Sequence, residues 1–222
     1  MSFSHDRTDE PSQIEPTTFR TWLRILAKNK NAVLWLLRFP DLGEQNIRQT
    51  AINWAGKETA SRIIFTDVAP KHAHIARAQV CDLFLDTPEC NAHTTAADIL
   101  WSGTPMLTYP RYKYKMCSRM ASSILTSALP DSESGREARR ELVASSDEDY
   151  EDKANRLCSD LRYGRGSRGQ ASGRLVEMRR MLFTNRWQSK LFDTPRWVND
   201  LENAYEKVWE AWVRGEESDV WL

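Results

Sequence analysis

The chain has four histidines, and three of them, His72, His74 and His93, lie in one short segment. The same segment carries further polar side chains, namely Lys71, Arg77, Asp86, Cys90, Thr94, Thr95 and Asp98. Cations and hydroxyls gathered in this way suit an anionic ligand, whereas histidines close to cysteines suit a metal ion. Local spacing within the segment indicates which of these two kinds of site to expect.

The first part of the segment, APKHAHIAR from Ala69 to Arg77, predicts the start of a helix, because Pro70 suits a first helical turn. Lys71 then lies at the positive end of the helix dipole, where a cation is unfavourable and an anion is stabilised by about 0.3 to 1 kcal/mol. Lys71, His74 and Arg77 are three residues apart and share one side of this helix. We expect them to surround one planar, anionic ligand. The alternative is a solvated polar face without a ligand.

The second part of the segment is Asn91-Ala-His-Thr-Thr95, between a predicted strand that ends at Asp86 and a predicted helix that begins near Thr94. The first turn of a helix offers unpaired N–H groups and a positive partial charge, and the two threonine hydroxyls add donors. This combination predicts a phosphate or pyrophosphate site, with Asp98 one turn later able to accept hydrogen bonds from a ribose diol. The alternative is that Thr94 is an ordinary N-cap and His93 a satisfied core histidine.

A metal site is the competing interpretation of the same segment. His72 and His74, Cys81, and Cys90 with His93 are metal-ligand types, but no spacing among them matches a zinc finger. We therefore expect no metal and no other cofactor. The four cysteines include no CxxC pair, which predicts thiols rather than a disulfide framework.

Apolar runs alternate with amphipathic segments through the first half of the chain. Strands are predicted at 32–37, 62–66, 83–85 and 105–108, and helices at 44–56, 71–80 and 94–101, after a first helix with apolar positions from Phe19 to Leu26. Such alternation with short connections predicts an α/β fold with a Rossmann-like, doubly wound parallel sheet. Ligands of such sheets bind at the carboxyl ends of the strands, where both parts of the polar segment fall.

The second half of the chain predicts mainly trailing helices, at 116–126, 147–163 and from Thr194 to the residues before Gly215. The last helix has aromatic residues at helical spacing, and we interpret this stripe as core. The predicted domains are a disordered segment at 1–15, a Rossmann-like lobe at 16–192, to which the family resemblance given below assigns UDP-sugar binding, and a C-terminal helix and tail at 193–222. The sequence GRGSRG at 164–169 fits GxGxxG, but it follows a predicted helix and opens no βαβ unit, so we do not interpret it as a dinucleotide site.

Charge and hydropathy limit the possible partners. The 222 residues include 31 basic and 31 acidic side chains, and this net charge of zero argues against nucleic-acid binding. The arginines around 162–180 are the one feature of the sequence that would favour it. The apolar run at 32–37 is far shorter than the roughly 20 residues that span a bilayer, so no membrane partner is expected. The polar start at 1–13 lacks a secretory pattern, which predicts a cytoplasmic or nuclear protein.

A resemblance to one family is carried by the segments NAVLWLLRFP, RIIFTDVAPKHAHIARAQVCDLFLDTPECNAHTTAADILWSGTPMLTYP and EDYEDKANRLCSDL. They resemble the C-terminal catalytic lobe of the protein O-linked N-acetylglucosamine (O-GlcNAc) transferases, glycosyltransferase family 41. The resemblance runs nearly without gaps from about Ile14 to Pro110 and more loosely to about Gly215. It implies a GT-B fold, in which the C-terminal Rossmann-like lobe holds UDP-GlcNAc, and metal-independent, inverting transfer of the sugar to Ser or Thr hydroxyls of nuclear and cytosolic proteins.

The resemblance also implies a role for each matching residue. The UDP-binding residues would be Ala69, Pro70, Lys71, His74, Arg77, His93, Thr94, Thr95 and Asp98. In this arrangement the backbone of Ala69 and the side chains of His74 and Arg77 hold the uracil, and Lys71 and Asp98 hold the ribose region.

The remaining implied roles concern the reacting end of the donor. His93, Thr94 and Thr95 would bind the diphosphate, and Cys90 is the candidate for the sugar pocket. The family's expected catalytic base belongs to an N-terminal lobe outside this chain, so no catalytic residue is assigned here. The expected partners are UDP-GlcNAc, acceptor proteins and a missing N-terminal lobe or repeat domain. A UDP-binding fragment without turnover is the alternative function.

Overall fold

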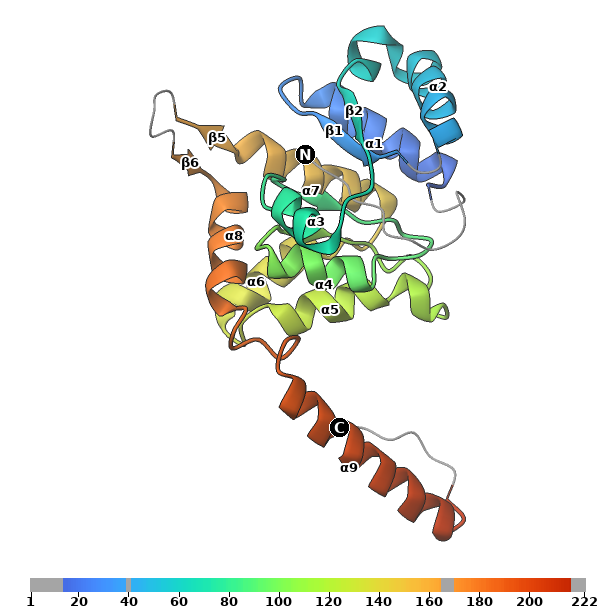
Figure 1. Cartoon of the computed structure of the whole chain (residues 1–222), viewed down its shortest axis with the longest axis vertical. Helices are drawn as coiled ribbons and strands as arrows, with labels where there is room; N and C mark the ends of the chain where they lie inside the picture. The colour runs from blue at the N-terminus through green and yellow to red at the C-terminus, as the bar shows by residue number, and fades with distance from the viewer. Residues whose placement is uncertain (1–13, 39–40, 165–169, 217–222) are drawn as a thin grey trace.

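The computed structural model describes residues 14–38, 41–164 and 170–216, which form a body of helices around short strands, with one long helix leading away from it (Figure 1). The predicted disordered segment 1–15 lies outside the described residues except for Ile14 and Glu15. The end of the predicted tail, from 217, and residues 165–169 of the GxGxxG-like stretch also lie outside them.

Helices and strands alternate through the first half, as the apolar pattern predicts. The elements are α1 (Pro16–Lys28), β1 (Leu34–Leu37), α2 (Asp41–Ala60), β2 (Ile63–Thr66), α3 (Lys71–Ala78), β3 (Phe84–Leu85), α4 (Thr94–Trp101) and β4 (Met106–Leu107). α4 is followed by Gly103 in a left-handed conformation with φ 86°, where a side chain would crowd the backbone oxygen of Arg179 at 3.3 Å. This glycine therefore lets the chain turn directly into β4.

The second half contains η2 (Met116–Ser118), α5 (Met120–Ala128), α6 (Glu133–Leu142), α7 (Asp147–Asp160), β5 (Arg162–Tyr163), β6 (Ala171–Ser172), α8 (Arg174–Asn185) and α9 (Thr194–Val213). The sequence pattern did not predict α6. Ser132 caps this helix by accepting a hydrogen bond from the N–H of Gly135 at 3.2 Å. α7 ends three residues before the predicted end, because Arg162 and Tyr163 pair with β6.

The main strand pairs are parallel and are joined through helices. β1 pairs with β2 from Leu34↔Ile63 to Leu37↔Thr66, and β3 pairs with β4 at Phe84↔Met106. A parallel bridge from Thr108 to Val143 continues the second pair. Hydrogen bonds link the described strands only in twos, so the coarse α/β arrangement is confirmed, and one continuous doubly wound sheet stays a prediction.

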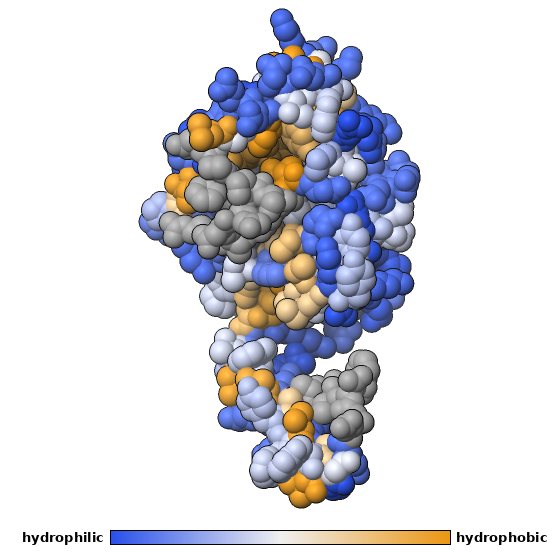
Figure 2. All heavy atoms as spheres, turned by 90° about the vertical axis from the view of Figure 1, so that its right-hand side faces the viewer, coloured by the Kyte–Doolittle hydropathy of each residue, from blue (hydrophilic) through white to orange (hydrophobic). Residues whose placement is uncertain are grey.

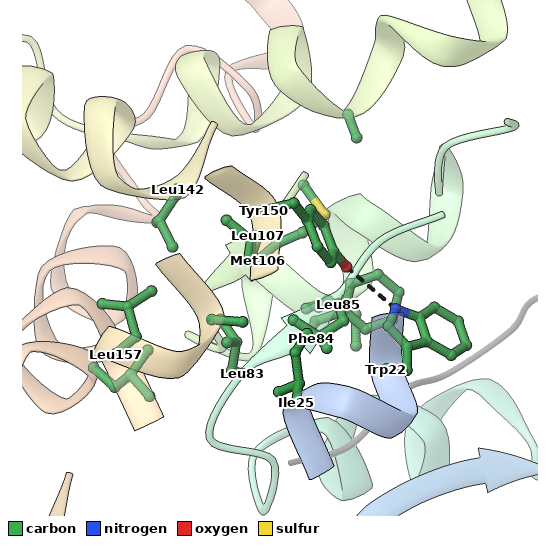
Figure 3. Close-up of a cluster of buried hydrophobic side chains, with 14 of the residues drawn as sticks. Trp22, Ile25, Leu83, Phe84, Leu85, Met106, Leu107, Leu142, Tyr150 and Leu157 are labelled. Carbon is green, nitrogen blue, oxygen red and sulfur yellow. Dashed lines mark hydrogen bonds between the residues drawn. The ribbon is translucent and has the colours of Figure 1, made fainter. Parts of the chain in front are cut away.

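The core lies between α1, α7 and the strands β3 and β4 (Figure 3). Leu83 and Leu85 are enclosed there, and Trp22 and Ile25 of α1 reach the same cluster. The Trp22 indole N–H donates to the Tyr150 hydroxyl at 3.4 Å, and that hydroxyl donates to a main-chain carbonyl at the end of β3 at 2.9 Å. A polar chain therefore crosses the apolar core and joins α1, α7 and β3.

The aromatic stripe of α9 is not core, and the prediction that it would be was wrong. Trp197, Trp209 and Trp212 are 61%, 64% and 70% exposed, and Ala211 is the one side chain of this helix that counts as buried. Figure 1 shows α9 leading away from the body, and apolar side chains are visible on that end of the molecule in Figure 2. Helical periodicity identified an amphipathic helix but does not specify what covers its apolar face.

The capping of α9 also differs from expectation. From its sequence we expect Thr194 to cap this helix and Pro195 to lie in its first turn; the Asp193 carboxylate instead accepts from the N–H of Arg196 at 3.1 Å, and Pro195 lies in the first turn. In the described part of the chain, no helix combines the length and the apolar character that crossing a bilayer requires.

Two tryptophan-to-alanine variants test this description of core and surface. Trp22→Ala removes a side chain that is 3% exposed, and we expect it to lower the free energy of unfolding by about 3 to 5 kcal/mol. The matched variant Trp209→Ala should change the free energy of unfolding by less than about 0.5 kcal/mol. Urea denaturation measures both, and equal losses would contradict the exposed position of α9.

Candidate functional site

The two parts of the polar segment meet where α3 and α4 begin. α3 follows β2 and α4 follows β3, and the two helices lie in contact (Figure 1). The Lys71 ammonium at the start of α3 is 3.4 Å from the carboxylate of Asp98, the fifth residue of α4. The structure therefore brings the two predicted half-sites together, and this ion pair joins them.

The α3 half of the site begins at Ala69 and Pro70, and Pro70 directly precedes the helix. The Pro70 carbonyl accepts from the N–H of His74 at 2.9 Å, which closes the first helical turn. Arg77 is oriented by donating to the Asp67 carbonyl at 2.8 Å. The Nε2 atom of His74 is buried and has no hydrogen-bond partner in the described structure, which is unusual for a buried polar atom.

The α4 half of the site begins at His93, which occupies the N-cap position with φ −103° and ψ −89°. The alternative in which Thr94 is the N-cap is therefore wrong. No side chain caps this helix within the described structure, and its first turn contains no acidic residue. The Nε2 atom of His93 is buried without a partner, and Thr95 is 3% exposed. An uncapped helix start with hydroxyls and an unsatisfied imidazole suits an anion.

The loop that leads into α4 is fixed from inside the protein. Asp86 at the end of β3 is 1% exposed, and its carboxylate accepts from the N–H of Ala92 at 2.7 Å and from the Thr108 hydroxyl at 2.7 Å. The buried Asn91 side chain donates to the Thr87 carbonyl at 2.9 Å. The sequence places Asp86 at the end of a predicted strand but does not indicate these hydrogen bonds, because they join residues that only the fold brings together.

Burial dominates the electrostatics of this loop. It raises the pKa of Asp86 to about 7, although hydrogen bonds from Ala92, Thr108 and Thr87 favour the ionised form. Burial also raises the pKa of the Cys90 thiol, and the neighbouring Cys117 raises it further. Cys90 is therefore held as a neutral thiol beside the loop, which suits contact with an uncharged group more than nucleophilic catalysis.

A second polar group, which the sequence did not indicate, braces the same loop from outside. Glu89 accepts from the Tyr112 hydroxyl at 2.6 Å and pairs with Lys115 at 3.1 Å. Arg111 lies 3.8 Å from Glu89 and 3.0 Å from Glu15, the residue before α1. The loop before α4 is thus tied to the start of α1 and to the segment before η2.

A metal centre has no support in this geometry. Among the described residues, no three or more His, Cys, Asp or Glu side chains are grouped so that they could hold a metal ion. His74 lies in α3 and His93 at the N-cap of α4, and the buried Nε2 atom of each has no hydrogen-bond partner among the described residues.

The chain is similar to known glycosyltransferases over most of its length. The model of the family described as glycosyl transferase family 41 matches residues 9–201. A probable UDP-N-acetylglucosamine–peptide N-acetylglucosaminyltransferase of Arabidopsis thaliana is 37% identical over 92% of this chain, and the enzyme of that name from Caenorhabditis elegans is 37% identical over 91%. This chain spans only 19% and 16% of the lengths of these two relatives.

The fold is similar to that of a solved enzyme. A mutant of the O-GlcNAc transferase of Thermobaculum terrenum superposes with a TM-score of 0.70 at 25% sequence identity. The similarity covers 94% of this chain and 35% of that one.

The raised pKa of Asp86 predicts a pH dependence of stability. Because the folded state holds the proton more tightly than the unfolded state, where the pKa is about 3.9, this stabilisation is complete below pH 4 and is lost as the pH rises towards 7. The loss is on the order of 4 kcal/mol at about 1.4 kcal/mol for each pH unit. Asp86→Asn lacks this titration, so its stability relative to the wild type should rise between pH 4 and pH 8 in urea denaturation. A pH-independent difference would show that Asp86 titrates normally.

Proposed function

Because this chain belongs to glycosyl transferase family 41, we propose that it forms the nucleotide-sugar-binding half of an inverting protein O-GlcNAc transferase. The proposed donor is UDP-GlcNAc, and the proposed acceptors are Ser and Thr hydroxyls of intracellular proteins. The names of the relatives, which are peptide N-acetylglucosaminyltransferases that use UDP-N-acetylglucosamine, support this assignment. We further propose that the parallel strand pairs belong to the Rossmann-like C-terminal lobe of a GT-B fold, as the similarity to the bacterial transferase suggests.

The observation that carries the proposal is the ion pair between Lys71 and Asp98, which joins the start of α3 to α4. The buried imidazole nitrogens of His74 and His93 have no hydrogen-bond partner among the described residues. In the proposal, Ala69 and Pro70 border the uracil, which His74 and Arg77 contact. Lys71, already held beside Asp98, approaches the ribose together with that carboxylate.

The proposed chemistry of the α4 half is stabilisation of charge. When the sugar leaves, negative charge develops on the diphosphate, and preorganised donors lower the energy of that state. His93, Thr94 and Thr95 would surround the diphosphate at the uncapped start of α4, where the helix dipole also favours an anion. Cys90, kept neutral by burial, would line the sugar pocket. The site needs neither a metal nor another cofactor for this role.

The proposal extends to partners and location. Transfer would require acceptor-side groups from an N-terminal lobe, and a repeat domain would select acceptor proteins. Binding of UDP without turnover is the second candidate function, because the gathered side chains serve the nucleotide and none is assigned as the base. We propose a cytoplasmic or nuclear location, supported by four cysteines that are thiols rather than disulfides.

UDP binding can be measured as a rise in the melting temperature. At a UDP concentration 100 times Kd, binding adds about 2.7 kcal/mol of stability, which corresponds to several degrees. We expect Lys71→Ala to abolish this rise and His72→Ala to keep it, because His72 lies exposed on the same helix, outside the proposed site. The absence of any response of the wild type to millimolar UDP would overturn both candidate functions.

Transfer of labelled N-acetylglucosamine from UDP-GlcNAc to a Ser- and Thr-containing peptide separates the two candidate functions. Turnover that His93→Ala reduces by about 100-fold, an amount typical for the loss of a charge-stabilising donor, would support the transferase. UDP binding without transfer would support the binding function.

A further inference from the structure

Asp86 is a buried carboxylate, and no charged side chain among the described residues pairs with it. Its side chain is 1% exposed, and the groups that shift its pKa are hydrogen-bond donors rather than cations. Burial of an uncompensated carboxylate is unfavourable, and an apolar residue would fill the end of β3 at lower cost. A residue that breaks this rule needs a compensating role, and such residues gather at functional sites.

The main chain of Asp86 is held on both sides, so its carboxylate has a fixed position. Its N–H donates to the Leu107 carbonyl at 2.9 Å, which continues the β3–β4 pairing. Its carbonyl accepts from the Tyr150 hydroxyl at 2.9 Å, and Tyr150 is itself 3% exposed. The carboxylate therefore projects from the part of the core where α1, α7 and two strands meet.

The contacts of the carboxylate connect this part of the core to the loop before α4. One oxygen accepts from the Thr108 hydroxyl of the neighbouring strand segment at 2.7 Å, and the other accepts from the N–H of Ala92 at 2.7 Å. Ala92 directly precedes His93, the N-cap of α4. The position of the Ala92 N–H therefore determines where His93 lies and in which direction the first turn of α4 starts.

We propose that Asp86 is a positioning residue for the diphosphate site, acting through the Ala92 N–H on the start of α4. This inference rests on the proposed function, since it assigns the diphosphate to that helix start. Both carboxylate oxygens are occupied by protein donors, so Asp86 does not touch the ligand. Its effect is limited to the α4 half of the site, because the α3 half is built on β2 and on the Pro70 carbonyl.

This limit gives the experiment its readout. UDP uses both halves of the site, whereas uridine lacks the diphosphate and uses the α3 half and Asp98, which lies one turn beyond the start of α4. We therefore compare the affinities of UDP and uridine by NMR titration of the full chain, in the wild type and in Asp86 variants. Loss of positioning lowers the ratio of the two affinities, whereas general loosening of the fold lowers both affinities together.

Asp86→Ala removes both acceptor oxygens, and we expect UDP affinity to fall about tenfold or more while uridine affinity stays within about twofold. Asp86→Asn keeps an amide oxygen for the Ala92 N–H and an amide group for Thr108, so its affinity ratio should stay within about threefold of the wild-type ratio. Asn155→Ala is the matched control, because it removes another buried polar side chain, which accepts from Asn29 at 2.8 Å, far from the loop.

The inference is overturned if folded Asp86→Ala keeps the wild-type ratio, or if its UDP and uridine affinities fall in parallel. Should Asp86→Ala fail to fold, Asp86→Leu is the second variant, because its apolar side chain has the same heavy-atom connectivity as aspartate and lacks the acceptors. The same change in ratio is expected. A wild type that binds neither UDP nor uridine contradicts the proposed function itself, which is a different result from an unchanged ratio.

Discussion

The structure depends on one constraint. The loop between Asp86 and His93 carries polar backbone groups into the protein interior, where they need hydrogen-bond partners, and α4 then begins without a capping hydrogen bond from the side chain of its N-cap residue. Asp86 satisfies it by accepting from the Ala92 N–H inside the protein, and Asn91 by donating to the Thr87 carbonyl. The His93 side chain makes no capping hydrogen bond at the start of α4. These internal partners satisfy the buried polar groups of the loop itself.

The positive character of the site arises mainly from backbone rather than from side-chain charge. Lys71 is paired with Asp98, and Arg77 is turned towards the Asp67 carbonyl. The starts of α3 and α4 supply positive partial charge that no counterion within either helix neutralises, since neither first turn contains an acidic residue. A neutral chain can in this way present a local anion site, because oriented peptide dipoles do not appear in the net charge.

Local patterns predicted the alternating elements of the first half and the meeting of the two half-sites, because buried strands and helix starts leave short-range signals. They missed α6, whose GREARREL stretch hides its few buried positions among charges, and they misassigned the face of α9. Local sequence patterns also did not indicate the role of Asp86. Its partners Ala92 and Thr108 lie six and twenty-two residues away, and only the pairing of β3 with β4 brings them together.

The exposed face of α9 has a spectroscopic consequence. Its indoles, including the stacked pair Trp209 and Trp212 with ring centroids 5.2 Å apart, lie in water, whereas the indole of Trp22 lies in the core. The two environments divide the intrinsic fluorescence into a long-wavelength, easily quenched population and a shielded one. Trp187, which precedes α9 and is 75% exposed, belongs to the first population as well, so the shielded signal reports on the core more selectively than the quenched signal reports on the projecting helix.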